Sequence, residues 1–438
     1  MVSTIILGII SIGILIFIHE LGHFLVARVV GIRVEVFSIG WGKGIQLFKW
    51  KDTKIQLGLI PFGGYCKMAG DSAYDNLTGS KDEYYSSPPI NRIMVALGGP
   101  LFNFMFAILL FTMIMMIGYQ IKTYPNKIIL AKPQDINENT QLTPAQKAGL
   151  KNGDIIIAIN GKKVNNWDDI TENIIRNALK KIQITVLRDG KELNLEVIPD
   201  IDKSSGRGVI GIYPWVEPVV GGVLPNSDAK KLGIKPGDRV VSVDGMPIHN
   251  QVEFYHILSK KKGRSINLVI ERNGKKLNYD VLIGRNSDTT LGIYFKQIKL
   301  HSPKYSLPES IELGVKKSLE ATRDTVRGMI LLFSGKIRAK TAVAGPAKII
   351  YLSGVIAKEG FVYFLQVMSY ISIALFIMNL IPFPALDGSH IMIALLEAVR
   401  KKKPNLEVIQ RIQAIGFTLL ILLSLFVTFN DISSFIKR

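Results

Sequence analysis

Four stretches of this chain are almost free of charged side chains for long enough to cross a lipid bilayer. A spanning helix needs about 20 apolar residues, so this feature constrains the fold more than any other. The stretches run over Met1–Val26, Ile93–Ile117, Phe361–Leu386 and Ile412–Phe429. Hydrophobic residues make up 48% of the 438 and charged residues 20%. We therefore predict an α-helical polytopic membrane protein with four transmembrane helices.

The distribution of basic residues predicts the orientation. No Lys or Arg precedes the first stretch, whereas Arg28 and Arg33 follow it, and Arg400–Lys403 lie in the link between the last two stretches. Because short cytoplasmic loops carry the basic excess, both termini and residues 119 to 360 are expected on the outer side. The net charge of +19 is not gathered on one arm or helix face, so nucleic acid is not an expected partner.

The outer segment contains an internal duplication. Gly149–Asp154 recurs as Gly233–Asp238, and two turn motifs recur at the same spacing of 84 residues: Asn160-Gly161 as Asp244-Gly245, and Arg188-Asp189-Gly190 as Arg272-Asn273-Gly274. Each copy predicts a strand, a turn, a helix and a hairpin. These modules, within Lys122–Leu300, resemble bacterial PDZ domains, which bind peptides by strand addition. The alternative is that the two α/β modules only gate or space the chain.

The first stretch contains a metal-binding pattern. His19-Glu20-Leu21-Gly22-His23 matches H-E-x-x-H, in which two His one helical turn apart ligate zinc and the Glu acts on water at the metal. Ionisable groups inside a membrane span are costly and usually functional. The alternative is that these residues sit past the end of a short helix. The single cysteine, Cys66, excludes Cys-based zinc clusters.

A third protein ligand is expected, since catalytic zinc sites usually have three. Four other histidines offer poor candidates because they lie in the outer segment or after the third stretch: His249, His256, His301 and His390. A carboxylate is the better prospect. Asp387 follows two prolines that break the helix at membrane depth, although Asp-Gly is also an ordinary turn.

These motifs together resemble the site-2 protease family of intramembrane zinc metalloproteases. The resemblance rests on the H-E-x-x-H motif and on Asn379-x-x-Pro382-x-Pro384-x-Leu386-Asp387-Gly388, with support from Gly98-Gly99-Pro100-x-x-Asn103 and Gly31–Gly40. It runs nearly end to end and is greatest to the bacterial type with tandem PDZ domains. It implies that His19, His23 and Asp387 bind Zn²⁺ and that Glu20 is the general base. It also implies that Asn379 helps to hold an unwound substrate strand.

The chain is predicted to consist of five segments. They are an N-terminal membrane domain (1–121), two PDZ-like domains (122–205 and 206–300), an amphipathic membrane-surface segment (301–360) and a C-terminal membrane domain (361–438). Residues 31 to 65 favour a membrane-associated β-hairpin, either structural or able to pair with substrate. The segment 301–360 carries Lys and Arg among apolar runs too short to span, which suits a helix on the outer membrane surface or a plain helical connector.

The expected function is hydrolysis of peptide bonds in transmembrane segments of other proteins. The expected partners are single-span membrane protein substrates, the lipid bilayer and peptide ligands of the PDZ-like domains. The family implies a multi-pass protein of the bacterial inner membrane that takes part in regulated intramembrane proteolysis, with anti-sigma factors or remnant signal peptides as substrates. The rival functions are a catalytically inactive PDZ-bearing scaffold and, less favoured, a zinc transporter, which needs polar groups along several spans.

Overall fold

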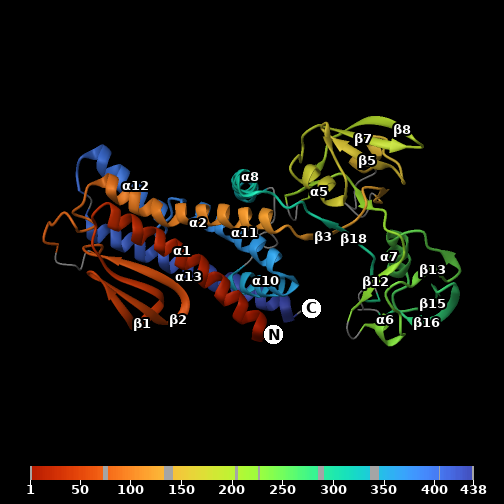
Figure 1. The fold of residues 1–438 in the computed structure, drawn as a ribbon, viewed down its shortest axis with the longest axis horizontal. Helices are drawn as coiled ribbons and strands as arrows, with labels where there is room; N and C mark the ends of the chain where they lie inside the picture. The colour runs from red at the N-terminus through yellow and green to blue at the C-terminus, as the bar shows by residue number, and fades with distance from the viewer. Residues whose placement is uncertain are drawn as a thin grey trace. The chain divides into compact units, whose positions relative to one another are not determined.

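The computed structural model describes residues 2–72, 77–132, 142–202, 206–224, 227–284, 291–335, 345–403 and 405–436. The chain forms two compact units, which are described separately. Residues 1–119 and 303–438 make the first unit, and residues 120–302 make the second (Figure 1).

The first unit is a helical bundle with one small sheet. Its helices are α1 (Val2–Val29), α2 (Pro89–Ile117), α8 (Leu307–Phe333), α10 (Pro346–Glu359), α11 (Phe361–Asn379), α12 (Asp387–Arg400) and α13 (Leu406–Ile436). Among the described residues, four helices are long and apolar enough to cross a membrane, at Ser3–Val29, Pro89–Ile117, Phe361–Asn379 and Leu406–Phe429. The predicted count of four is confirmed. The chain is an integral membrane protein.

The third and fourth spans differ in extent from the prediction. Helix α11 ends at Asn379 instead of continuing to Leu386, because Pro382 and Pro384 lie in an irregular loop and a new helix, α12, starts at Asp387. Helix α13 begins at Leu406, six residues before the predicted start. The helix that forms the fourth span therefore contains the polar Gln410 as well as Gln413.

Glycines let α1 and α2 approach closely. A Cβ atom on Gly22 of α1 would lie 2.3 Å from the carbonyl oxygen of Gly98, and one on Gly98 would lie 2.7 Å from the carbonyl oxygen of Gly22. Small residues at a helix crossing allow backbones to pack in a membrane, where helices gain little from excluding water. This crossing places the H-E-x-x-H turn of α1 directly against α2.

Strands β1 (Val34–Trp50) and β2 (Thr53–Met68) form more than the predicted hairpin. Ile39 and Ile45, both in β1, pair with the same residue, Leu57, so each strand folds back on itself. The result is a sheet of four segments in the order 64–68, 34–39, 54–57 and 44–50. Gly40 and Gly42, with φ of 95° and 87°, allow the reversal within β1. The sheet lies at the same end of the unit as α12 (Figure 1).

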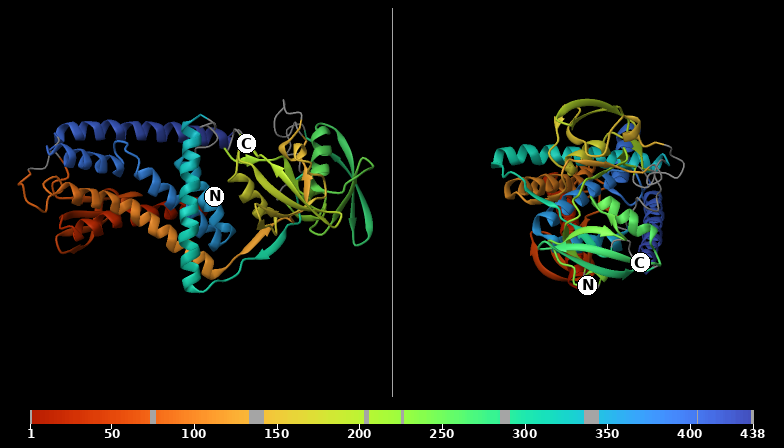
Figure 2. Two further views of the ribbon diagram at one scale, coloured as in Figure 1. Left: turned by 90° about the horizontal axis from the view of Figure 1, so that it is seen from above. Right: turned by 90° about the vertical axis from the view of Figure 1, so that its right-hand side faces the viewer.

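Helix α8 runs across the long helices and not along them (Figure 2). Its small residues Ser310, Gly314, Ser318 and Ala321 are buried, and a Cβ atom on Gly314 would lie 2.4 Å from Thr112 Oγ1 of α2. A second stripe of α8 is apolar and exposed, at Ile311, Leu319, Val326, Ile330 and Phe333. This pattern is typical of a helix on a membrane surface, and the assignment of segment 301–360 to that surface stays a prediction. Lys336, Arg338 and Lys340 of that segment lie outside the described residues.

The second unit contains two similar α/β modules. The first comprises β4 (Ile128–Leu130), α4 (Pro144–Lys147), β5 (Ile155–Ile159), β6 (Lys162–Lys163), α5 (Trp167–Ile175), β7 (Ile182–Arg188), β8 (Lys191–Val197), β9 (Asp200–Ile201), β10 (Gly208–Val209) and β11 (Ile212–Pro214). The second comprises β12 (Val220–Val223), α6 (Asp228–Lys231), β13 (Arg239–Val243), β14 (Met246–Pro247), α7 (Gln251–Lys260), β15 (Ser265–Arg272), β16 (Lys275–Leu282) and β17 (Ile293–Phe295). Strands β3 (Gln120–Thr123) and β18 (Ile298–His301) pair at the two ends of the unit.

The four-stranded sheets of the two modules have the same topology, which confirms the duplication. The four-stranded sheets have the orders β6-β5-β7-β8 and β14-β13-β15-β16, and β11-β4 and β12-β17 add a strand pair to each module. Each module has its own apolar core, around Ile156 and Ile184 in the first and around Phe254 and Leu268 in the second. The chain therefore carries two PDZ-like α/β domains. The boundary between them at residues 205 and 206 stays a prediction. Strand β11 lies after this boundary in the sequence but pairs with β4 of the first module.

The motif repeated at 84 residues holds each module together by the same ion pair. Arg188 Nε donates to Asp154 Oδ1 at 2.7 Å and its Nη2 to the Gly149 carbonyl at 2.8 Å; Arg272, Asp238 and Gly233 repeat both distances. Burial alone would raise the pKa of Asp154 and of Asp238, but the arginine hydrogen bonds lower both below their ordinary value. The repeated G-x-x-x-G-D motif therefore has a structural role, because its first Gly and its Asp both accept hydrogen bonds from the arginine of the same module.

Candidate metal centre

The two histidines of the motif lie on one face of α1, as their spacing predicts. His19 and His23 are four residues apart inside the helix, which continues to Val29, so they do not sit past its end. Their Nε2 atoms are 3.2 Å apart, and His23 is 8% exposed. The sequence alternative of a short helix ending before the motif is therefore wrong.

Asp387 comes from the opposite end of the chain and meets both imidazoles. It is the first residue of α12 and directly follows the irregular loop that contains Pro382 and Pro384. Its Oδ2 atom lies 3.1 Å from His19 Nε2, and its Oδ1 atom lies 3.3 Å from His23 Nε2. Among the residues that the structure describes, these three side chains form the one group of His, Cys, Asp or Glu able to hold a metal ion.

Helix α2 fixes the orientation of both rings. Nδ1 of His23 lies 2.8 Å from the Val95 carbonyl oxygen, which can only accept, so Nδ1 carries the hydrogen and Nε2 is free to bind a cation. Nδ1 of His19 lies 3.1 Å from the side-chain amide nitrogen of buried Asn103. The amide oxygen of Asn103 has no partner, and a turn of the amide lets this oxygen accept from Nδ1–H in the metal-binding tautomer.

Glu20 lies beside the three ligands and next to the sheet. It interacts electrostatically with His19, His23 and Asp387, and it accepts a hydrogen bond from the backbone of Cys66 in β2. A Cβ atom on Gly64 would lie 3.2 Å from Glu20 Cγ, so the absence of a side chain there lets the carboxylate approach the strand. The segment 64–68, at one edge of the sheet, therefore runs past the candidate base.

The donor set fits zinc. Ligand atoms about 2.0–2.1 Å from a tetrahedral centre are about 3.3 Å apart. The observed separations among the two Nε2 atoms and the nearest carboxylate oxygens are 3.2, 3.1 and 3.3 Å. The Asp387 Oδ2 atom is buried without a hydrogen-bond partner, which a cation at this position would explain. Two imidazoles and one carboxylate with one open position are a typical catalytic zinc set.

Comparison with known proteins decides the family. The model of peptidase family M50 matches residues 7–423. The chain belongs to this family. The Escherichia coli protein named regulator of sigma-E protease RseP is 30% identical over 452 residues, which cover 97% of each chain. A Treponema pallidum relative, whose name describes a zinc metalloprotease, is 28% identical over 98% of each chain.

Family membership confirms the predicted reaction. The chain is a zinc-dependent intramembrane metalloprotease and not an inactive scaffold.

Among solved structures, the PDZ domain of an SdrC-like protein from Listeria monocytogenes is similar to part of the chain, at 17% identity and a TM-score of 0.16, over 20% of this chain and 92% of that one. The assignment of individual residues to the reaction remains a proposal based on geometry.

The structure brings four of the five predicted site residues together. His19, Glu20, His23 and Asp387 form the cluster. Asn379 is the last residue of α11, half-buried, and no contact found among the described residues joins it to the cluster. Sequence reasoning named Gly99 and Asn103 only as family matches and missed Gln413. A polar Gln inside an apolar span was the available signal for Gln413.

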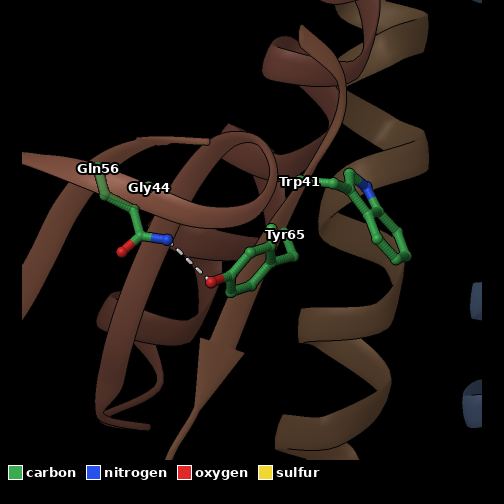
Figure 3. A pocket seen from close by; sticks show the side chains of 5 residues that line it. Trp41, Gly44, Gln56 and Tyr65 are labelled. Atoms are coloured by element: carbon green, nitrogen blue, oxygen red, sulfur yellow. Dashed lines mark hydrogen bonds between the residues drawn. The ribbon is translucent and has the colours of Figure 1, made fainter. Parts of the chain in front are cut away.

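A cavity of about 710 Å³ opens on the sheet, lined by Trp41, Gly42, Gly44, Gln56 and Tyr65 (Figure 3). The Gln56 amide points at the Tyr65 hydroxyl and donates to it at 2.9 Å. Tyr65 alternates along β2 with Gly64 and Cys66, so its side chain points to the opposite face of the sheet from Glu20. This cavity is therefore separate from the metal centre.

Gly99 of α2 leaves room for the metal centre. A Cβ atom there would lie 2.3 Å from His23 Nε2 and 2.8 Å from His19 Nε2. We expect Gly99→Ala to displace the rings and weaken zinc binding by about tenfold or more. Equilibrium competition with a chelator measures this. Gly13→Ala, where a Cβ atom of α1 would meet nothing within 4 Å, is the matched control; equal effects of the two variants would contradict this reading.

Proposed function

We propose that this chain cleaves transmembrane segments with zinc held by His19, His23 and Asp387 and with Glu20 as the general base. The assignment rests on the convergence of three possible ligand atoms, which lie within 4.8 Å of one another. His19, His23 and the neighbouring Glu20 belong to the first span. Bound zinc supplies a Lewis acid that lowers the pKa of water and polarises a peptide carbonyl.

The side chains around the zinc site move and position protons. Glu20 takes a proton from the attacking water and later delivers it to the leaving amide nitrogen. Its proximity to His19, His23 and Asp387 supports this role, because a water on an ion held by those residues would lie beside its carboxylate. Val95 and Asn103 keep Nδ1 of each imidazole engaged, so the rings present Nε2 in a fixed direction.

Substrate must be unwound before it is cut, because a helical peptide bond is enclosed by its own hydrogen bonds and side chains. We propose that the unwound segment lies along residues 64–68 of β2, an edge of the sheet beside Glu20, and forms strand-like hydrogen bonds there. Asn379 is proposed to hold the segment through its amide. If Asn379→Ala leaves KM for a single-span substrate unchanged, this role is wrong.

The test uses purified protein in detergent with a model single-span substrate. We expect cleavage by the wild type, loss of cleavage after a zinc chelator, and recovery when zinc is returned. Cleavage that survives complete removal of zinc would overturn the proposal. The name of the Escherichia coli relative, a regulator of sigma-E protease, favours membrane-bound anti-sigma factors over remnant signal peptides as the substrate class.

The protein is proposed to lie in the inner membrane of a bacterium with both termini and residues 122–300 on the periplasmic side. The support is the clustering of Arg28 and Arg33 after the first span and of Arg400–Lys403 between the last two. Alkaline phosphatase fused after residue 130 should be active, and a fusion after residue 402 inactive. The reverse pattern would invert the topology.

The PDZ-like domains are proposed to restrict access to substrates whose outer domains have already been trimmed. They sit in one insertion between the second and third spans, with paired strands β3 and β18 at its two ends. Deletion of residues 122–300 should therefore allow cleavage of untrimmed substrates. Unchanged selectivity after the deletion would leave peptide binding as the role of these domains.

A further inference from the structure

Gln413 is a polar residue in the fourth span whose two amide functions are both used. Its Oε1 atom accepts a hydrogen bond from the backbone N–H of Ala385. Its Nε2 atom donates to Ser389 Oγ at 2.8 Å, and this hydroxyl donates to the Leu386 carbonyl oxygen at 2.7 Å. The amide therefore contacts the chain two residues before and two residues after Asp387.

The loop that Gln413 contacts has a costly backbone. Ala385 has φ of 75°, in the left-handed region that residues other than glycine rarely adopt. Pro382 and Pro384 have no backbone N–H and cannot help to hold this turn by donating hydrogen bonds. A Cβ atom on Gly416, one turn after Gln413, would lie 2.3 Å from Pro384 Cβ, so α13 rests directly on the loop.

Helix α13 is otherwise sparsely packed. Only 6% of its most apolar window is buried within the structure, the lowest share among the four candidate spans. A polar amide on such a helix is costly in the membrane unless it is satisfied. The Gln413 amide is satisfied by the chain on either side of Asp387. It therefore connects the least buried of the four spans to the irregular loop that carries this residue of the metal centre.

We propose that Gln413 is a positioning residue that holds the Ala385 turn and thereby keeps the Asp387 carboxylate facing His19 and His23. The proposal rests on the assignment of Asp387 as a metal ligand. Gln413 makes no contact with the reacting atoms, so its loss changes how well the ligand is presented and not the ligand set itself. Asp387 is 364 residues from His23 in sequence, and the Gln413 contacts restrict its position on both sides.

The test compares zinc affinity, by chelator competition, in full-length purified variants. Gln413→Met keeps the shape of the side chain and removes both hydrogen bonds, and we expect zinc affinity to fall about 10- to 100-fold. Gln410→Met is the matched control, since Gln410 is one turn earlier on α13 and donates to Ser72 Oγ at 2.9 Å, away from the loop. It should leave zinc affinity within about twofold of wild type.

A second substitution separates positioning from general damage. Glycine adopts the left-handed conformation freely, so Ala385→Gly in the Gln413→Met background should recover about tenfold in zinc affinity. Gln413→Glu, which keeps the acceptor for Ala385, should lose less affinity than Gln413→Met, and it replaces Gln413→Met if that variant does not fold. Unchanged affinity in Gln413→Met, equal losses in Gln413→Met and Gln410→Met, or no recovery with Ala385→Gly would overturn the proposal.

Asp387→Asn is measured in parallel. A large loss of zinc affinity in Asp387→Asn with none in Gln413→Met would reject the role of Gln413 alone. Retained zinc affinity in Asp387→Asn would instead reject the ligand assignment on which the proposal rests.

Discussion

Replacing Glu20 by glutamine is expected to lower the rate of cleavage by about 10²- to 10⁴-fold while the protein still binds one equivalent of zinc. Glutamine has nearly the same shape and can still accept a hydrogen bond from the Cys66 backbone. It cannot take a proton from water. Because Glu20 is not in the group of ligand atoms formed by His19, His23 and Asp387, zinc binding should survive.

The measurement pairs substrate cleavage with metal analysis on the same preparations. His23→Ala serves as the contrasting variant, since it removes a ligand atom and should lose both zinc and activity. A Glu20→Gln protein that cleaves at the wild-type rate would remove the general-base role. One that loses zinc as fully as His23→Ala would make Glu20 part of the metal centre.

The H-E-x-x-H site could be predicted from sequence because its geometry is local. Residues four apart on a helix share a face wherever that helix is placed, so His19 and His23 needed no tertiary information. Asp387 is different. Nothing in the residues around it specifies that it approaches His19, and only the family resemblance selected it over an ordinary Asp-Gly turn.

The contacts that orient the ligands could not be predicted, because they depend on which helices cross and where. Asn103 and Gly99 act on the histidines only because Gly22 and Gly98 let α1 and α2 touch. The sheet shows the same limit. The β-favouring residues between positions 31 and 65 predict strands. The register in which Leu57 pairs with both Ile39 and Ile45 could not be predicted, because it depends on glycine turns that local propensity does not specify.

The end of the third span was predicted only in part: the two prolines were expected to break the helix, but the apolar stretch was extended to Leu386 instead of Asn379. Leu380–Leu386 is apolar enough to extend a membrane helix, and hydropathy alone favours doing so. Two prolines spaced two apart remove backbone donors and disfavour the helical region for the residues before them. The chain therefore leaves the helix at Asn379 and starts α12 with Asp387 at its first position.

Arg92 and Glu397 form a buried ion pair that ties α2 to α12. Arg92 Nη2 donates to Glu397 Oε2 at 2.6 Å, and the two side chains are only 2% and 10% exposed. The guanidinium also lies 5.8 Å from the centroid of the Tyr85 ring. Because α12 begins at Asp387 and Glu397 lies near its other end, the pair fixes the helix that carries the proposed third ligand.

Removing one partner of this pair should destabilise the protein by about 3–5 kcal/mol, because an uncompensated charge stays buried. Arg92→Met and Glu397→Met are each expected to show this loss in reversible unfolding of the detergent-solubilised chain. The double variant should recover most of it, since an apolar pair leaves no charge without a partner. Losses that simply add in the double variant would contradict a direct coupling between the two charges.

An exposed arginine provides the matched comparison. Arg33 pairs with Asp82 at 2.9 Å, but the two side chains are 45% and 38% exposed. Water screens such a pair, so Arg33→Met should cost about 1 kcal/mol or less. If Arg92→Met costs no more than Arg33→Met, the buried pair does not contribute the stability expected of it, and α12 does not depend on this pair for its position.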